Sequence, residues 1–463
     1  MEQNVEFMDT FSPEKITEIA DEKESITDDE IEAEQKKAKT RSIIPNLIHY
    51  VRDHDKVKYL VKENDELHIK EYALIEDQLY KPKQDLPIEI LSPSIICNSL
   101  PNEEDVLKQL ECFVKKYIEF PYEQWYLILS LWIAHTYFIE KLNVTPILNV
   151  FGVKETGKTR VGEICYLLSF RCERLTSPTE ATVFRSAHYF QTTLVIDEIK
   201  LWGHDGNKGV ANLIKSRYKR GMRVARTNLN RAGEDQIEYF DVFAPLAICS
   251  TETMPDIIKS RCVTFIMQRN INHNVENEID TQEAQKIREE LTLLRSKYFD
   301  LDLPTIKPVA RRRLNEIMMP LVQICSIMDS SRMEELLDFI QHQELCRRDE
   351  ESETIECVIV RAIHDHYALA EDSVFLTHDI RAEINKDRSQ KDLCSDRYVA
   401  SCINRLGFEK ARAKSGPAKG RRGFHHDEDL LNKLLGNYGI EVDNRNKSDS
   451  PMLSDTCDTC DSL

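Results

Sequence analysis

The spacing of apolar residues changes along the chain, and each change predicts a different kind of element. Residues 43–100 alternate apolar and polar positions in short runs, which is typical of a small sheet of hairpins. Residues 101–145 repeat apolar positions with a helical period, which predicts packed helices. From 146 to 273, apolar runs typical of buried strands alternate with helical patterns. This alternation predicts an α/β core, in which a parallel sheet is flanked by helices.

The patterns that follow predict two more folded units. Residues 274–348 are helical by periodicity and are expected to form a helical lid. We expect the charged run RRDEESE to end this helical segment. Residues 354–440 predict helices, then two short arms around the basic stretch KSGPAKG, then a last helix. That order is the one found in a winged helix with a basic wing. The two ends, 1–42 and 441–463, are expected to be disordered.

The bulk composition limits the class of protein. At 463 residues the chain is too long for one compact core, and 41% of its residues are apolar. Its most apolar segment, WYLILSLWIAHTYF, is too short to cross a bilayer, so no membrane partner is expected. The first residues lack the basic flank and apolar core of a secretory signal, which predicts a cytoplasmic protein. Cys457 and Cys460 have no second pair at ligand spacing, so no zinc is expected.

The formal net charge of -18 argues against a nucleic-acid partner, but the charges are unevenly distributed. The segment 1–35 holds 13 acids and 2 bases, which predicts a solvated tail able to bind a basic partner. Elsewhere the bases gather in KSRYKRGMRVAR, ARRRL and EKARAKSGPAKGRRGF. A phosphate backbone responds to such local clusters, so DNA remains a candidate partner.

The most specific motif is the loop GVKETGKT, which follows a predicted strand and precedes a predicted helix. Gly152, Gly157, Lys158 and Thr159 fit the pattern G-x-x-x-x-G-K-[ST] in full. Glycines allow backbone N–H groups to surround phosphates, the lysine reaches the terminal phosphates, and the threonine hydroxyl ligates Mg²⁺. The predicted ATP-binding residues of this loop are Gly152, Val153, Lys154, Glu155, Thr156, Gly157, Lys158, Thr159 and Arg160.

A second motif, TTLVIDE, is an apolar strand that ends in two carboxylates, Asp197 and Glu198. Buried carboxylates need a cation or a reaction to justify their desolvation. We expect Asp197 to hold the Mg²⁺ that bridges the phosphates, and Glu198 to orient and deprotonate the attacking water.

A third motif, PLAICSTETMPDIIKSR, ends a strand in Ser250 and Thr251 and places Arg261 a helix-sized step later. Together with the P-loop, these residues resemble the AAA+ ATPases. The resemblance implies that Thr251, or otherwise Ser250, is the polar sensor that helps to place the lytic water. It also implies that Arg261 is an arginine finger acting on ATP bound by the neighbouring subunit. Arg313 in ARRRLNEIMMPL would be the second sensing arginine, carried by the lid.

Two short strands, MRVARTNL and QIEYFDVF, are joined by NRAGED and predict a hairpin before the sensor strand. An inserted hairpin there resembles the superfamily 3 and MCM-type helicases. The resemblance implies that the hairpin grips DNA in the channel of a ring, with Arg231 at the tip and Arg223 and Arg226 along one arm. An ordinary solvated hairpin is the alternative.

The C-terminal unit adds a second basic element. Its likeness to a winged helix predicts DNA contacts by Lys414, Lys419, Arg421 and Arg422. Residues 103–440 as a whole resemble the helicase-like ATPase part of phage and plasmid primase-helicase proteins. Residues 1–102 leave no room for a recognisable primase domain, which puts primer synthesis in doubt.

This resemblance implies a Mg²⁺-dependent, ATP-hydrolysing DNA helicase or translocase that acts in the replication of a mobile genetic element. Its partners would be DNA, further copies of itself in a hexameric or similar ring, and a primase or polymerase docked on the acidic N-terminal tail. Two alternatives stay open. One is a nucleotide-gated DNA-binding switch that does not translocate, and the other is a P-loop kinase for a small molecule.

Overall fold

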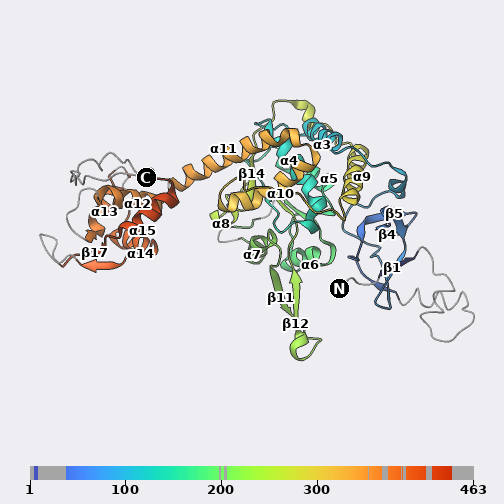
Figure 1. The fold of residues 1–463 in the computed structure, drawn as a ribbon, viewed down its shortest axis with the longest axis horizontal. Helices are drawn as coiled ribbons and strands as arrows, with labels where there is room; N and C mark the ends of the chain where they lie inside the picture. The colour runs from blue at the N-terminus through green and yellow to red at the C-terminus, as the bar shows by residue number, and fades with distance from the viewer. Residues whose placement is uncertain are drawn as a thin grey trace, which may run out of the picture. The chain divides into compact units, whose positions relative to one another are not determined.

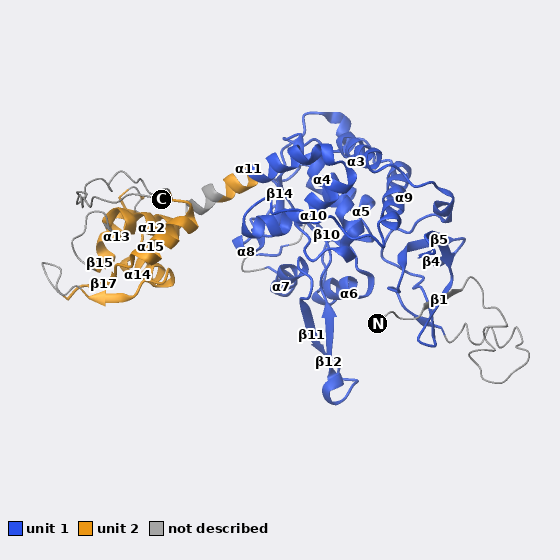
Figure 2. Cartoon of the chain, viewed as in Figure 1, with its two compact units in different colours: residues 1–341 blue, residues 342–463 orange. Residues whose placement is uncertain are grey.

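The computed structural model describes residues 5–8, 38–197, 200–202, 206–352, 354–367, 374–386, 388, 393–412 and 420–440 (Figure 1). The chain forms two compact units, residues 1–341 and residues 342–463 (Figure 2). Unit 1 contains the predicted sheet core, and unit 2 contains the predicted C-terminal elements.

The centre of unit 1 is a five-stranded sheet in which all neighbouring strands run parallel. The predicted α/β core is therefore confirmed. Its inner strands are apolar and buried on both faces, as expected for a sheet with helices on either side. In sheet order the strands are β14 (Cys262–Ile266), β8 (Ile147–Phe151), β13 (Leu246–Ser250), β10 (Thr193–Asp197) and β9 (Cys172–Leu175).

Helices connect the strands and begin at recognisable caps. Thr179 accepts a hydrogen bond from the Thr182 N–H, and Asn207 accepts one from the Val210 N–H, so each supplies a partner to a helix N-terminus. The connecting helices are α5 (Lys158–Leu168), α6 (Glu180–Phe190), α7 (Lys208–Arg217) and α8 (Asp256–Lys259).

A helical layer packs on the sheet in one continuous hydrophobic core. The predicted helices before and after the sheet both contribute to this layer. One boundary prediction is wrong, because the last helix continues through the charged run to Ser352. Arginine and glutamate are good helix formers, so charge alone did not end it. The elements are α3 (Glu103–Tyr117), α4 (Gln124–His135), the 3₁₀ helix η2 (Thr136–Lys141), α9 (Thr281–Lys297), α10 (Arg312–Met328) and α11 (Met333–Ser352).

The N-terminal β unit consists of two small sheets, as the alternating pattern predicts. The expected disordered tail over 1–42 is wrong at two places, because residues 5–8 and 39–40 are strands at the edges of one sheet. VEFM is rich in strand-forming residues, and pairing satisfies an otherwise open sheet edge. One sheet contains β3 (Leu47–Asp53), β4 (Lys56–Glu63) and β5 (Glu66–Lys70), and the other contains β1 (Val5–Met8), β6 (Tyr72–Ile75), β7 (Gln78–Lys81) and β2 (Lys39–Thr40).

The predicted hairpin is present and projects away from helices α3 and α4 (Figure 1). Its strands, β11 (Arg223–Thr227) and β12 (Ile237–Asp241), pair antiparallel. It leaves the core between α7 and β13, so it stands directly before the predicted sensor strand.

Unit 2 combines helices with a three-stranded antiparallel sheet of order β15-β17-β16. Apolar residues of its helices and strands form a separate core around Phe375 and Phe424. The elements are α12 (Ile355–Tyr367), β15 (Val374–Leu376), α13 (Thr377–Ile384), α14 (Asp396–Arg405), β16 (Lys410–Arg412), β17 (Arg422–His425) and α15 (Glu428–Tyr438).

None of the helices in the described part of the chain combines the length and hydropathy that a membrane crossing requires.

The buried His135 gives unit 1 a predictable acid sensitivity. Its Nδ1 bonds to the Trp132 carbonyl and its Nε2 lies 2.8 Å from Thr145 Oγ1, so the neutral ring donates to the first and accepts from the second. Burial lowers the pKa of His135 to about 4. The folded state thus binds this proton less readily than the unfolded state does, and stability present above pH ~6.5 is lost as the pH falls.

We expect this loss to reach about 3 kcal/mol at pH 4. The measurement is urea unfolding of wild type and His135→Gln from pH 7.5 to pH 4.5. We expect the variant to have a lower free energy of unfolding than wild type at neutral pH. The difference between the two free energies should narrow as the pH falls. A difference that stays constant with pH would contradict the assignment.

Candidate nucleotide site

The P-loop lies where the sequence places it, between the end of β8 at Phe151 and the start of α5 at Lys158. Gly157 has a φ of 78°, in the left-handed region that glycine adopts without cost. Gly152 is needed for space, because a Cβ there would lie 2.7 Å from Thr156 Oγ1 and 2.9 Å from the Met267 carbonyl oxygen. The loop therefore turns tightly against the end of β14.

Polar groups of the loop converge on the carbonyl of Val153. It accepts hydrogen bonds from Thr156 Oγ1, at 2.9 Å, and from the Lys158 ammonium. Side chains of Lys154, Glu155 and Thr159 are exposed. The Lys158 ammonium is thus held against the backbone of the P-loop.

One predicted loop residue points elsewhere. The Arg160 guanidinium donates to the Glu276 carbonyl oxygen at 3.1 Å, in the 3₁₀ helix η4 (His273–Glu276). It also lies 3.7 Å from Glu163, one turn along the same helix. In this structure Arg160 therefore ties α5 to the segment after β14 and does not face the loop.

The second predicted element, Asp197, ends the inner strand β10 and is only 4% exposed. Its Oδ2 accepts a bond of 2.6 Å from Arg174 Nη2 on the neighbouring strand β9. Asp197 also pairs in register with Cys249 of β13. The bond to Arg174 uses one carboxylate oxygen of Asp197 and fixes the direction of the side chain.

Asp197 and Lys158 both act electrostatically on the Cys249 thiol. Burial and the Asp197 carboxylate raise the pKa of this thiol to about 12, whereas Arg174 and Lys158 act to lower it. Helix α5 approaches closely here, because a Cβ on Gly162 would lie 3.1 Å from Cys249 Sγ. This close packing places the start of α5 over the ends of β10 and β13.

The sensor strand β13 ends at the same edge. Ser250 is buried and its Oγ accepts the Glu252 N–H at 2.8 Å, while Thr251 is exposed in the bend that follows. Ser250 pairs in register with Phe151, the residue before the P-loop. Glu252 accepts the N–H groups of Leu201 and Trp202, and so joins this bend to the segment after Asp197.

The two remaining predicted arginines lie together at the opposite end of the sheet, where its strands begin. The Arg261 and Arg313 guanidinium carbons lie 4.9 Å and 5.4 Å from the ring centre of Tyr218, and Arg313 also donates to its hydroxyl. The Arg261 carbonyl accepts the N–H of Ile147, the first residue of β8, and the Tyr218 carbonyl accepts that of Thr145. These contacts place the arginine pair where β8 begins.

The strand β8 therefore separates Arg261 and Arg313 from the P-loop of their own chain. Five residues of strand span roughly 16 Å. A different arginine lies close to the loop: Arg269, just after β14, is 3.6 Å from Glu155.

Each hairpin arginine is paired with an acid. Arg223 is 2.9 Å from Asp241, Arg226 is 2.7 Å from Glu180, and Arg231 is 3.2 Å from Glu238. Arg231 lies in the turn between β11 and β12, as predicted. Arg223 and Arg231 are largely exposed and Arg226 is partly exposed, and ion pairs at the surface contribute only about 0–1 kcal/mol. A phosphate group can therefore replace the carboxylate.

Of the predicted contacts in the C-terminal unit, Arg421 and Arg422 are exposed at the start of β17. Lys414, Lys419 and the predicted general base Glu198 lie outside the described residues. No geometry is therefore assigned to these three.

Sequence reasoning missed Arg174, Tyr218 and Glu252. Arg174 stands only 23 residues from Asp197, but nothing in the sequence says that β9 pairs with β10. Tyr218 and Glu252 act through contacts with residues far along the chain. No separate strand over Cys172–Leu175 is predicted from the sequence, so no local signal pointed to Arg174.

The residues at this edge fit a magnesium ion bound together with phosphates. Mg²⁺ takes oxygen ligands and is usually held by one or two protein groups plus phosphates and waters. Asp197 supplies a buried carboxylate with its second oxygen outside the bond to Arg174, and Thr159 supplies an exposed hydroxyl at the start of α5. These two residues would hold the ion.

No protein-family model matches the chain, and no curated protein sequence matches it significantly. Among solved structures it is similar to the C-terminal region (305-718) of NrS-1, at 13% identity over 82% of this chain and 96% of that one, with a TM-score of 0.39. It is also similar to a full-length MCM homologue from Methanopyrus kandleri, at 10% identity over 64% and 75% of the two chains, with a TM-score of 0.32.

A third similar structure is JCV helicase, at 11% identity over 52% of this chain and 60% of that one, with a TM-score of 0.25. Of these three solved structures, JCV helicase is a helicase by its name. TM-scores of this size reflect loose likeness, so the functional argument rests on the residues of the chain itself.

The tight turn at Gly152 generates a prediction for nucleotide binding. In Gly152→Ala the new methyl group would meet the Met267 carbonyl and the Thr156 hydroxyl, so the loop must open. Overpacking of this kind costs about 1–3 kcal/mol, and we expect ATP affinity to fall about tenfold or more. The measurement is titration with a fluorescent ATP analogue.

Gly436→Ala is the matched control, because nothing lies within 4 Å of a Cβ at this position in α15. The control should bind the analogue as wild type does and unfold no earlier, since alanine favours helix. Wild-type affinity in Gly152→Ala would show that the loop does not bind the phosphates.

Proposed function

We propose that the chain is a Mg²⁺-dependent ATPase of the AAA+ type that forms a ring and moves along or unwinds DNA. The observation that carries the proposal is the P-loop at one edge of a parallel sheet. There the strand, the glycine loop and the helix bring Lys158 to the same edge as Asp197. The resemblance of the motifs to primase-helicase proteins extends the proposal to replication of a mobile genetic element.

The chemistry follows from the groups at this edge. Backbone N–H groups between Gly152 and Thr159 would bind the phosphates, and Lys158 would exchange the Val153 carbonyl for the terminal phosphate oxygens. Mg²⁺, when bound, would neutralise charge that develops on the phosphoryl group. Asp197 is held in place for this ion by Arg174. Glu198, the next residue, would activate the water.

The positions of Arg261 and Arg313 support a ring. Both lie where β8 begins, whereas the P-loop follows the end of β8. An arginine finger at this edge can reach only ATP that another copy of the chain binds. Head-to-tail contacts that present this edge to the next P-loop are heterologous, and such contacts form a ring when the rotation between subunits closes. We therefore place the active site between neighbouring subunits.

Two separate elements support DNA as the substrate. The hairpin projects from the core with arginines in exchangeable ion pairs (Figure 1). In unit 2, the order α12, β15, α13, α14, β16, β17, α15 supports a winged helix, and Arg421 and Arg422 are exposed at the start of β17. Basic residues on projecting elements are the usual contacts to the phosphate backbone.

A second candidate function is a nucleotide-gated DNA-binding switch that does not translocate. The ion pairs of the hairpin favour it, because Arg223, Arg226 and Arg231 each lie beside a carboxylate of the same chain. In such a switch the hairpin is a structural element, and nucleotide binding alone changes the affinity of unit 2 for DNA.

The test is steady-state ATP hydrolysis with Mg²⁺, with and without single-stranded and duplex DNA. A translocase should show turnover that DNA raises, and Lys158→Ala and Glu198→Gln should each lower it by about 100-fold or more. In Arg231→Ala, turnover with DNA should fall to the level seen without DNA.

Lys286→Ala is the control for loss of a surface cation, since this exposed lysine of α9 makes only a long ion pair with Glu290. It should keep the wild-type response to DNA. Slow turnover that ignores DNA, with Arg231→Ala equal to wild type, would overturn the motor and favour the switch.

A further inference from the structure

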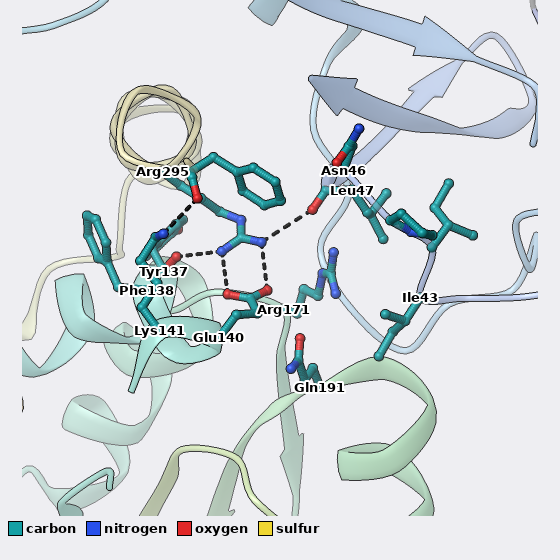
Figure 3. Close-up of a pocket in the computed structure, with 13 residues that line it drawn as sticks. Ile43, Asn46, Leu47, Tyr137, Phe138, Glu140, Lys141, Arg171, Gln191 and Arg295 are labelled. Carbon is teal, nitrogen blue, oxygen red and sulfur yellow. Dashed lines mark hydrogen bonds and ion pairs between the residues drawn. The ribbon is translucent and has the colours of Figure 1, made fainter. Parts of the chain in front are cut away.

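A cavity of about 300 Å³ lies between the N-terminal β unit and the ATPase core, within unit 1 (Figure 3). Its walls come from the segment before β3, from η2, from the turn between α5 and β9, from the end of α6, and from α9. This volume is at the lower end of the range for small-molecule sites. The cavity is separate from the P-loop, because its α5 side is the end of that helix and not its start.

The charges in this cavity are unbalanced. Three cationic side chains line it, Arg171, Arg295 and Lys141, against one carboxylate, Glu140. Arg295 binds both oxygens of that carboxylate, at 2.5 Å and 2.6 Å, and also donates to backbone carbonyls. Arg171 makes no hydrogen bond to this carboxylate among the described residues, although its charge also helps to lower the pKa of Glu140. Figure 3 shows these bonds as dashed lines. Lys141 donates to the Phe299 carbonyl at 2.7 Å.

Arg171 is left without a comparable partner. It is 2% exposed, and among the described residues its guanidinium makes one hydrogen bond, from Nη1 to the Phe190 carbonyl at 3.4 Å. Its Nε has no partner. The rings of Phe170 and Tyr50 lie 4.6 Å and 5.2 Å from the guanidinium carbon and cover it. A buried guanidinium with so few acceptors is costly unless an anion supplies them.

The backbone around the cavity is also unusual. Asn46, Arg171 and Gln191 all line it, and all have left-handed φ values of 56°, 45° and 54°. An arginine in this region costs about 1 kcal/mol or more, and such strain gathers at functional sites. Arg171 therefore lines the cavity with its backbone in a strained conformation.

We propose that this cavity binds a small organic anion, whose carboxylate or phosphate group pairs with Arg171 and whose apolar part lies against Leu47, Phe138 and Phe299. The planar guanidinium fork matches both anions, because each presents two oxygens to parallel N–H groups. The apolar residues Ile43, Ile44 and Pro45 complete the walls. The proposal rests on this cavity and does not depend on ATP hydrolysis.

The test uses three probes with the same ring: phenyl phosphate, benzoate and neutral phenol. Binding to the full chain is measured by isothermal titration at constant ionic strength. The P-loop also attracts phosphate, so each titration is repeated in Lys158→Ala. We expect at least one of the two anions to bind both wild type and Lys158→Ala, and phenol to bind at least about tenfold more weakly. The anion that binds more tightly identifies the class of ligand.

Two variants locate the binding. Arg171→Gln removes the guanidinium, and Gln191→Glu places a carboxylate in the same cavity. Each should weaken anion binding about tenfold or more, and Gln191→Glu should also raise the unfolding midpoint because it gives Arg171 a counter-ion. Lys286→Ala, on the same helix as Arg295, is the control and should bind as wild type does.

Three results would overturn the proposal. The first is anion binding that Lys158→Ala abolishes and Arg171→Gln retains, which would assign it to the P-loop. The second is phenol binding as tightly as the anions, which would make the cavity an apolar site. The third is a Gln191→Glu variant with a lower unfolding midpoint than wild type and an unchanged affinity for the anion. This result can be obtained even if Arg171→Gln does not fold.

Discussion

In a parallel sheet, the amino ends of all strands lie on one side and the carboxyl ends on the other. The proposed functional organisation of this chain depends on that constraint. The P-loop, Asp197 and Ser250 follow or end strands, so they gather at one edge. Arg261 precedes a strand and therefore lies at the opposite edge with Arg313. On the proposed function, one chain would carry both halves of the ATPase site without joining them, and assembly would be a condition of activity.

Local motifs could be predicted from the sequence, and contacts between distant segments could not. The P-loop, the acid strand and the hairpin are each defined within a few residues by glycine, strand pattern and turn chemistry. Strand order is not written in any local pattern, so the Arg174–Asp197 bond and the stacking of two arginines on Tyr218 were not foreseen. Residues 5–8 were assigned to a tail because acids surround them, although their own pattern suits an edge strand.

Buried arginines show how the same side chain serves different purposes in one fold. Arg217 donates to three backbone carbonyls and Arg295 holds Glu140, so both are satisfied and hold segments together. Arg171 is equally buried but makes a single long hydrogen bond. The difference lies in the acceptors around each guanidinium. This contrast is the basis for the proposal that Arg171 binds an anionic ligand, whereas Arg217 and Arg295 are structural.

Mixing two inactive variants tests the shared active site most directly. Lys158→Ala lacks the proposed phosphate-binding lysine and Arg261→Ala lacks the proposed arginine finger, so each should hydrolyse ATP poorly alone. In an equal mixture, about one quarter of the interfaces combine an intact P-loop with an intact arginine from the next subunit, and turnover should recover to about that fraction of wild type. No recovery on mixing, or wild-type turnover by Arg261→Ala alone, would contradict a site built between subunits.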